Sequence, residues 1–151
     1  MLEPNGRRKK VNELLVETFN SILRVEEAAL QNRLTAGLTI SEIHTIHAIG
    51  MYEASPMNVI ASRLDVTLAS CTTAVSKLVE KGYAERKRSE ADRRQVLVSL
   101  TKSGRKAYRA HELFHREMVD SALEDLTPEE EEVFARGMLK VKEFFDTHSR
   151  S

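Results

Sequence analysis

The most constraining feature of the sequence is the stretch from Val66 to Leu100, in which the spacing of the apolar residues changes from helical to alternating. Over 68–81 the apolar side chains recur at helical spacing, at Leu68, Cys71, Val75 and Leu78. Gly82 follows, and glycine commonly adopts the left-handed conformation that ends a helix. The next segments, YAERKR and QVLVSL, alternate like the two strands of a hairpin. The stretch therefore predicts a helix followed by a β-hairpin with a charged tip over 89–94.

The face of this helix opposite the apolar residues consists of short polar side chains and one lysine. A helix with such a face fits the major groove of DNA, where hydroxyl and ammonium groups contact base edges and phosphates. The candidate DNA contacts on it are Ser70, Thr72, Thr73, Ser76 and Lys77. Because short hydroxyl side chains suit several base edges, these residues do not predict which operator sequence is bound.

The distribution of charge points to the same segment. The chain has 23 basic and 23 acidic residues, so its formal net charge is zero. Basic residues nevertheless outnumber acidic ones from Lys81 to Arg109, while acidic residues gather over 124–132. A neutral chain with one basic segment favours a partner that carries phosphates at that segment.

Amphipathic helices are predicted on both sides of this stretch, over about 8–35 and about 102–147. Ser41 is the predicted N-cap of a short helix, and Ser55 followed by Pro56 marks the start of the next one. Asp65 falls in the turn before the groove-binding helix, where it tolerates a left-handed conformation. The segment Thr127-Pro-Glu-Glu is a capping box that starts the last helix.

The chain length favours one domain over residues 1–151, mostly α-helical with a small β-hairpin. The apolar stripe of the first helix is longer than one small domain covers, so part of it is expected to meet a second subunit. One cysteine excludes an internal disulfide, and no apolar run approaches the roughly 20 residues of a membrane span. A reducing cytoplasm is the expected location.

The order of these elements and the residues at their centre resemble the MarR family of winged helix-turn-helix transcription regulators. The most specific part is the wing, in which Asp92-Arg93-Arg94 is followed by VLVSLT and then by Lys102-Ser103-Gly104. The segment KLVEKGYAERKRS adds to the resemblance. It implies a homodimer with intertwined terminal helices, a DNA-binding lobe over about 39–100, and a pseudo-palindromic double-stranded operator.

The resemblance also implies roles for the wing residues. Arg94 is expected to enter a minor groove, where a narrow A·T-rich segment has enhanced negative potential. Asp92 is expected to orient the guanidinium group of Arg94. Arg88, Arg93 and Lys102 are expected to contact phosphates, which position the protein without specifying the sequence.

Within the family, several segments are similar to repressors of fatty-acid synthesis genes, among them SEIHTIHAIG, VTLASCTTAVSKL and HELFHREMVD. This subgroup resemblance implies a repressor whose corepressor is a long-chain acyl group delivered by acyl carrier protein. An effector bound between the dimerisation helices and the lobe would change the spacing of the two lobes.

Four residues form a candidate metal or effector site. His111 and His115 are one helical turn apart, and two imidazoles at that spacing form half of a metal site. His44 and Glu26 complete a set similar to that of the zinc-sensing branch of the family. The alternative is that the histidines line a ligand cavity or bond to carboxylates of the first helix. No cofactor is required by the prediction, and zinc is the candidate metal.

The lone cysteine, Cys71, is predicted to be a small core residue rather than a redox sensor, because it lies among the inward positions of its helix. An enzyme is not expected: the sequence has no G-x-S-x-G motif or phosphate loop, and a helical di-metal site would need two E-x-x-H motifs where only Glu112 to His115 provides one. A non-catalytic helical interaction module is the alternative from another class. The arginine-rich hairpin tip favours DNA instead.

Overall fold

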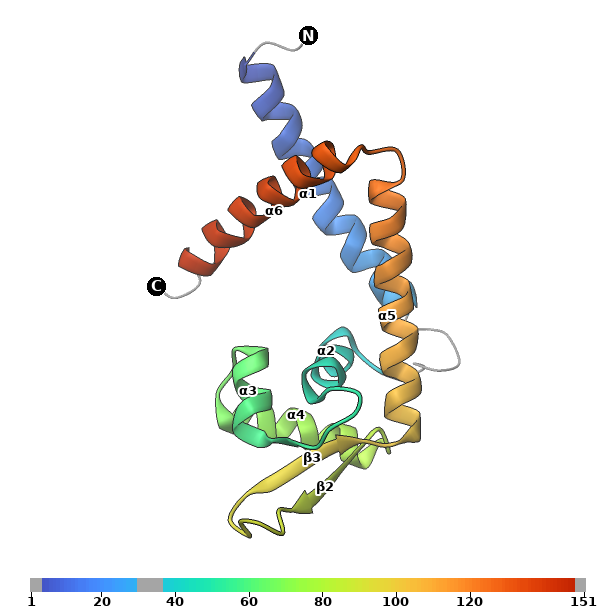
Figure 1. Ribbon diagram of the computed structural model, residues 1–151, viewed down its shortest axis with the longest axis vertical. Coiled ribbons are helices and arrows are strands. Elements are labelled where there is room, and N and C mark those ends of the chain that lie inside the picture. The colour runs from blue at the N-terminus through green and yellow to red at the C-terminus, as the bar shows by residue number, and fades with distance from the viewer. Residues whose placement is uncertain (1–3, 30–36, 149–151) are drawn as a thin grey trace. The chain divides into compact units, whose positions relative to one another are not determined.

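The computed structural model describes residues 4–29 and 37–148 (Figure 1). Its helices are α1 (Pro4–Ala29), α2 (Ile40–Ile49), α3 (Met57–Leu64), α4 (Leu68–Glu80), α5 (Lys102–Leu123) and α6 (Pro128–His148). Its strands are β1 (Ser55–Pro56), β2 (Ala84–Arg88) and β3 (Val96–Leu100). The predicted class, mostly helical with a β-hairpin, is confirmed. Residues 30–35 of the predicted first helix lie outside the described residues.

The chain forms two compact units, Met1–Glu112 and Leu113–Ser151. The boundary falls inside α5. The single domain, with its lobe and dimerisation helices, stays a prediction.

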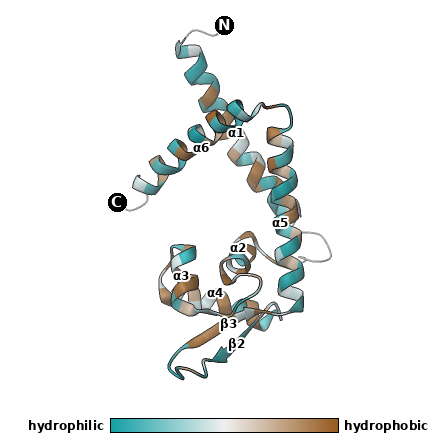
Figure 2. Cartoon of the chain, in the orientation of Figure 1, coloured by the Kyte–Doolittle hydropathy of each residue, from teal (hydrophilic) through white to brown (hydrophobic). Residues whose placement is uncertain are grey.

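The strands form one antiparallel sheet in the order β1-β3-β2. β2 and β3 pair from Ala84 opposite Leu100 to Arg88 opposite Val96, which confirms the predicted hairpin. β1 adds the pair Ser55 opposite Val98. The sequence did not predict this strand, because two residues are too few to alternate. Figure 2 shows that β3 is hydrophobic and β2 hydrophilic, so the central strand belongs to the core and the edge strand faces solvent.

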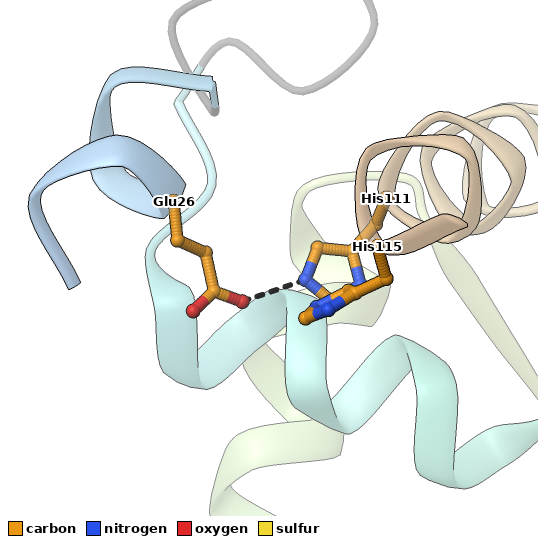
Figure 3. A group of neighbouring side chains, drawn as sticks. All are labelled: Glu26, His111 and His115. Carbon is orange, nitrogen blue, oxygen red and sulfur yellow. Dashed lines mark hydrogen bonds and ion pairs between the residues drawn. The ribbon is translucent and has the colours of Figure 1, made fainter. Parts of the chain in front are cut away.

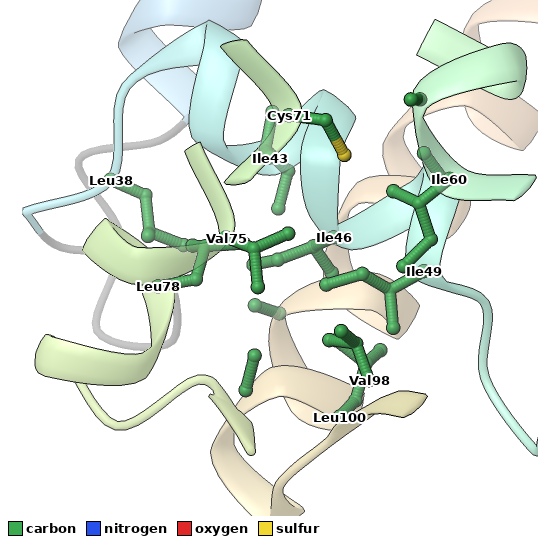
Figure 4. Close-up of a cluster of buried hydrophobic side chains, with 14 residues drawn as sticks. Leu38, Ile43, Ile46, Ile49, Ile60, Cys71, Val75, Leu78, Val98 and Leu100 are labelled. Carbon is green, nitrogen blue, oxygen red and sulfur yellow. The ribbon is translucent and has the colours of Figure 1, made fainter. Parts of the chain in front are cut away.

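The core of the first unit joins α2, α3 and α4 to this sheet (Figure 4). In Figure 1 these three helices lie together on one side of the sheet. The largest fully buried hydrophobic side chains are Ile43, Ile46, Ile49, Ile60, Val75, Leu78 and Val98. Fully burying each of them contributes about 1.5–3 kcal/mol relative to exposure. The core therefore fixes the position of α4 relative to the hairpin.

The start of α2 differs from the prediction. Its N-cap is Thr39, whose hydroxyl accepts a hydrogen bond from Glu42 N at 3.2 Å, while Glu42 Oε2 accepts one from Thr39 N at 3.0 Å. Ser41, the predicted N-cap, lies inside the helix, so that prediction is wrong. The spacing of Thr39 and Glu42 is the capping-box signature that reveals the true start. The capping box predicted at Thr127 is confirmed, since Thr127 N donates to Glu130 Oε2 at 2.8 Å.

The turns on either side of α4 follow the prediction. Asp65 adopts the left-handed conformation with φ of 54°, and Gly82 has φ of 80°. Leu68 is an exception to the predicted inward face, because 55% of it is exposed. It is the first residue of α4, and the core does not cover its side chain.

The start of α5 packs closely against the turn after α4. Thr101 N donates a hydrogen bond to Tyr83 O at 3.1 Å, and Thr101 Oγ1 donates one to Gly82 O at 2.6 Å. Gly104 lies against the same turn: a Cβ atom there would be 2.0 Å from Tyr83 O. A side chain at this position is therefore incompatible with the observed approach of the two segments.

Candidate nucleic-acid interface and histidine cluster

The groove-binding face predicted on α4 is present. Cys71, Val75 and Leu78 are fully buried and hold one side of the helix against the core. The opposite side of α4 carries polar residues and is largely exposed to solvent. Ser70, Thr72, Thr73 and Lys77 are exposed, and Ser76 is half-buried.

Several hydroxyl groups on and next to the outward face of α4 are already engaged in local hydrogen bonds. Thr72 Oγ1 donates to Leu68 O at 2.8 Å, and Thr73 Oγ1 donates to Ala69 O at 3.1 Å. At the N-cap, Thr67 Oγ1 accepts from Ser70 N at 3.2 Å and donates to Ser70 Oγ at 3.0 Å. Each bond uses a donor or an acceptor of a hydroxyl group, and only the donors and acceptors that remain can bond to DNA.

The tip of the hairpin is closed by its own hydrogen bonds. Ser89 is buried; its N donates to Gln95 O at 2.9 Å and its hydroxyl accepts from Asp92 N at 3.3 Å. Asp92 Oδ1 accepts from Arg94 N at 3.0 Å. Asp92 thus positions the main chain at Arg94. The expected ion pair with the Arg94 guanidinium is not formed between these described residues.

The closed tip presents its basic side chains to solvent. Arg93 and Arg94 are exposed at the tip, and Arg88 is exposed where the β2–β3 pairing ends. Lys102 is exposed at the first position of α5. Each of the predicted wing contacts is therefore accessible to a phosphate or a groove.

A partly buried ion pair that the sequence did not predict ties the end of α4 to α2. Lys81 Nζ donates to Glu42 Oε1 at 2.9 Å, to Glu42 Oε2 at 2.8 Å and to Gly37 O at 2.7 Å. Burial alone would raise the pKa of Glu42, but the hydrogen bonds from Lys81 and Thr39, with the charge of Lys81, hold that pKa below its ordinary value. The partners are 39 residues apart, so no local spacing reveals them.

Three of the four residues predicted as a metal or effector site lie together in the first unit. Glu26 Oε1 is 2.7 Å from His111 Nε2 and 3.1 Å from His44 Nε2. Figure 3 shows the bond between Glu26 of α1 and His111 of α5. The side chains of Glu26 and His111 are 5% and 6% exposed, whereas that of His44 is 51% exposed. The cluster therefore has one face open to solvent.

The electrostatics of this cluster favour an ionised carboxylate. Burial would raise the pKa of Glu26, but the hydrogen bonds and the charges of His111 and His44 lower it overall. His47 adds a third imidazole, stacked on Tyr108 at 4.1 Å and edge-on to His111 at 4.7 Å between ring centroids. His115, the fourth predicted residue, follows His111 by one turn of α5 (Figure 3).

Cys71 is a core residue, as predicted. Its side chain is fully buried, with Sγ 3.7 Å from both Met57 O and Met57 Sδ. Burial raises the pKa of the Cys71 thiol. The protonated thiol is a poor nucleophile, so this position is unsuited to an oxidation sensor.

A helix-turn-helix followed by a basic hairpin that returns through the central strand of a small sheet defines a winged helix-turn-helix protein. Comparison with known proteins agrees. A model of the MarR family matches residues 36–95. Streptococcus pneumoniae FabT, solved in complex with DNA, is 36% identical, with a TM-score of 0.83 over 93% of this chain and 98% of that one. The chain belongs to the MarR family.

Curated relatives are transcriptional regulators as well, which agrees with the prediction that the chain is not an enzyme. BilQ of Clostridium symbiosum is 30% identical over 95 residues, covering 62% of this chain and 65% of the relative. YhjH of Bacillus subtilis is 28% identical over 105 residues, covering 68% of this chain and 60% of the relative. The chain thus spans less than two thirds of the length of these relatives. None of the described helices has the length and apolar character needed to cross a membrane.

Proposed function

We propose that the chain is a sequence-specific DNA-binding transcription regulator. The observation that carries this proposal is the combination, within the first unit, of an exposed polar face on α4 with a closed, arginine-bearing hairpin tip. A helix of this kind occupies a major groove, and a wing beside it contacts the flanking minor groove or its phosphates. The complex of FabT with DNA supports a double-stranded DNA partner.

The regulator acts as a homodimer. Large apolar side chains of α1 are exposed along much of the helix, including Val11, Leu14, Val16 and Phe19, and α6 exposes Phe134, Phe144 and Phe145. Exposed large apolar side chains in such number on a helix are typical of an interaction site. A second copy that covers it would supply a second α4, and two recognition helices about 34 Å apart match successive major grooves of a pseudo-palindromic operator.

Selection of binding sites from random double-stranded DNA tests the proposal, followed by titration of the selected site with Arg94→Ala. We expect about a tenfold loss of affinity at fixed salt, because the variant loses a charged contact in a groove of enhanced negative potential. Arg116→Ala, which removes an exposed arginine of α5, is the matched control and should bind as the wild type does. Failure of the wild type to enrich any sequence would refute the proposal.

The effector is proposed separately. The resemblance of segments such as SEIHTIHAIG and HELFHREMVD to repressors of fatty-acid synthesis genes motivates the proposal of repression controlled by a long-chain acyl group presented on acyl carrier protein. The test is to repeat the titration with acylated and unacylated carrier protein. If the acyl group is the corepressor, the acylated form alone should strengthen binding to the operator.

A metal-responsive regulator is the second candidate, favoured by the contacts of Glu26. Two imidazole nitrogens approach the same carboxylate oxygen at 2.7 and 3.1 Å. Ligands of a tetrahedral zinc ion with bonds of about 2.0–2.1 Å lie roughly 3.3 Å apart, so a small expansion of the cluster would admit the ion. Zinc would replace the protons that now bridge Glu26 to His44 and His111, and His115 is the candidate fourth ligand.

Metal analysis of protein without a His-tag tests this candidate. We expect close to one zinc per chain for the wild type and a large loss for Glu26→Gln. Glu27→Gln, which changes the adjacent exposed carboxylate, should retain the metal. Less than about a tenth of an equivalent in the wild type after incubation with zinc would exclude a site of the affinity usual for such ligands.

A further inference from the structure

Three side chains form a row along the outward face of α4. Ser70, Thr73 and Lys77 are exposed and spaced three and four residues apart, so they lie one above another on the helix surface. With 3.6 residues per turn, Thr73 lies nearly opposite the buried Cys71, Val75 and Leu78. If α4 enters a major groove with its core side turned away, Thr73 is at the centre of the surface that meets the bases.

The hydroxyl of Thr73 already donates a hydrogen bond within the helix, so it can only accept a further one. A threonine hydroxyl has one proton to donate and two lone pairs that accept. Thr73 Oγ1 donates that proton to Ala69 O at 3.1 Å within the helix. Towards solvent the side chain therefore offers an acceptor and a methyl group.

Ser70 has the opposite polarity. Its Oγ accepts the hydroxyl proton of Thr67 at 3.0 Å, so the proton of Ser70 itself remains available for donation. Lys77, one turn after Thr73, carries only donors. Along the row the helix therefore offers a donor, an acceptor and a cationic donor, in that order.

The bases differ in whether they present hydrogen-bond donors or acceptors in the major groove. Adenine N6 and cytosine N4 carry amino groups that donate there, whereas guanine O6 and thymine O4 only accept. An acceptor on the protein can bond to the amino bases and is repelled by the keto oxygens. We propose that Thr73 is a specificity-determining residue, which accepts a hydrogen bond from the exocyclic amino group of an adenine or cytosine in each half-site. This inference rests on the proposed DNA-binding function and adds the chemistry of one contact to it.

Site selection with two variants tests the assignment. Thr73→Val keeps the branched shape and removes the acceptor, while Thr73→Ser keeps the hydroxyl and removes the methyl group. We expect the wild type to select adenine or cytosine at one position per half-site and Thr73→Val to lose that preference. Affinity for the selected site should fall about three- to tenfold, the change typical of one net hydrogen bond. Thr73→Ser should keep the preference.

A matched control separates base recognition from loss of the helical hydrogen bond. Thr147 Oγ1 makes the same type of bond to Glu143 O at 2.8 Å on α6, so Thr147→Val removes an equivalent bond away from α4. It should select the same sequences as the wild type. The inference is overturned if Thr73→Val selects the same bases with unchanged affinity, or if the preference it loses is for guanine or thymine. A wild type that enriches no sequence would instead remove the proposed function.

Discussion

Replacement of Gly104 by alanine has two opposite effects on stability: alanine favours the helix by its higher propensity, but its Cβ atom clashes with neighbouring atoms. Gly104 is a buried residue in the first turn of α5, and alanine in a helix interior is more favourable than glycine by about 1 kcal/mol. The added Cβ, however, would lie 2.0 Å from Tyr83 O and 3.1 Å from Leu100 Cβ. The obstacle at Tyr83 is backbone, so it cannot be avoided by a change of rotamer.

The contacts of Tyr83 indicate the size of the effect. A carbon normally lies about 3.3 Å or more from a carbonyl oxygen, so the two segments would have to separate by more than about 1 Å. Such a shift would break the bond from Thr101 N to Tyr83 O, a loss of about 1 kcal/mol. Overpacking typically costs about 1–3 kcal/mol. After the gain in helix propensity, we expect Gly104→Ala to lower the free energy of unfolding by about 1–3 kcal/mol.

Urea unfolding at equal protein concentrations measures this change, since the stability of a dimer depends on concentration. The control is Gly137→Ala in α6, where an added Cβ would meet nothing within 4 Å among the described residues of its own chain. That variant should be as stable as the wild type or more so. A Gly104→Ala protein that is as stable as the wild type would refute the reasoning about close approach.

Three further outcomes are expected. Lys81→Met should lower the free energy of unfolding by about 1–2 kcal/mol in urea titrations, less than for a fully buried pair because the lysine side chain is 39% exposed. The pKa of Glu42 is lowered from 4.5, so the stability it contributes is complete above that pH and is lost as the pH falls through the lowered pKa. The difference between wild type and Lys81→Met should therefore shrink in acid, and a constant difference would contradict this cause. Cys71 should react slowly with a thiol reagent in the native protein and quickly in urea; rapid native labelling would show that it is not held in the core. Asp92→Ala should weaken DNA binding while leaving the melting temperature unchanged, because it frees only the main chain at the wing tip; unchanged affinity in a gel-shift titration would argue against a positioning role.

The sequence predicts the elements whose signals are local. The helix over 68–80, the hairpin and the box at Thr127 each follow from spacing within one element or from a single turn. Ser41 is not the cap of α2 because Thr39 and Glu42 form a reciprocal capping box that starts the helix before it. The sequence does not predict β1, because a two-residue strand has no alternation of apolar and polar residues of its own and is defined only by its pairing with Val98.

Among the residues of the DNA interface and the histidine cluster, some are likewise predicted by local spacing in the sequence and others depend on contacts between distant residues. The outward face of α4 follows from helical periodicity alone. The bond between Lys81 and Glu42 depends on how α4 packs against α2, which no spacing encodes. The family resemblance predicts Glu26 as a partner of His44 and His111, and in the structure both imidazoles bond to its carboxylate.

The closed tip of the hairpin has a thermodynamic consequence for the proposed complex. Hydrogen bonds among Ser89, Asp92, Arg94 and Gln95 order this segment before any DNA is present. Ordering one residue of a free loop costs about 1–2 kcal/mol of backbone entropy. A segment that is already ordered avoids this loss on association, so more of the attraction between the arginines and DNA appears as affinity. The short polar turn thereby contributes to binding through the entropy of the unbound protein.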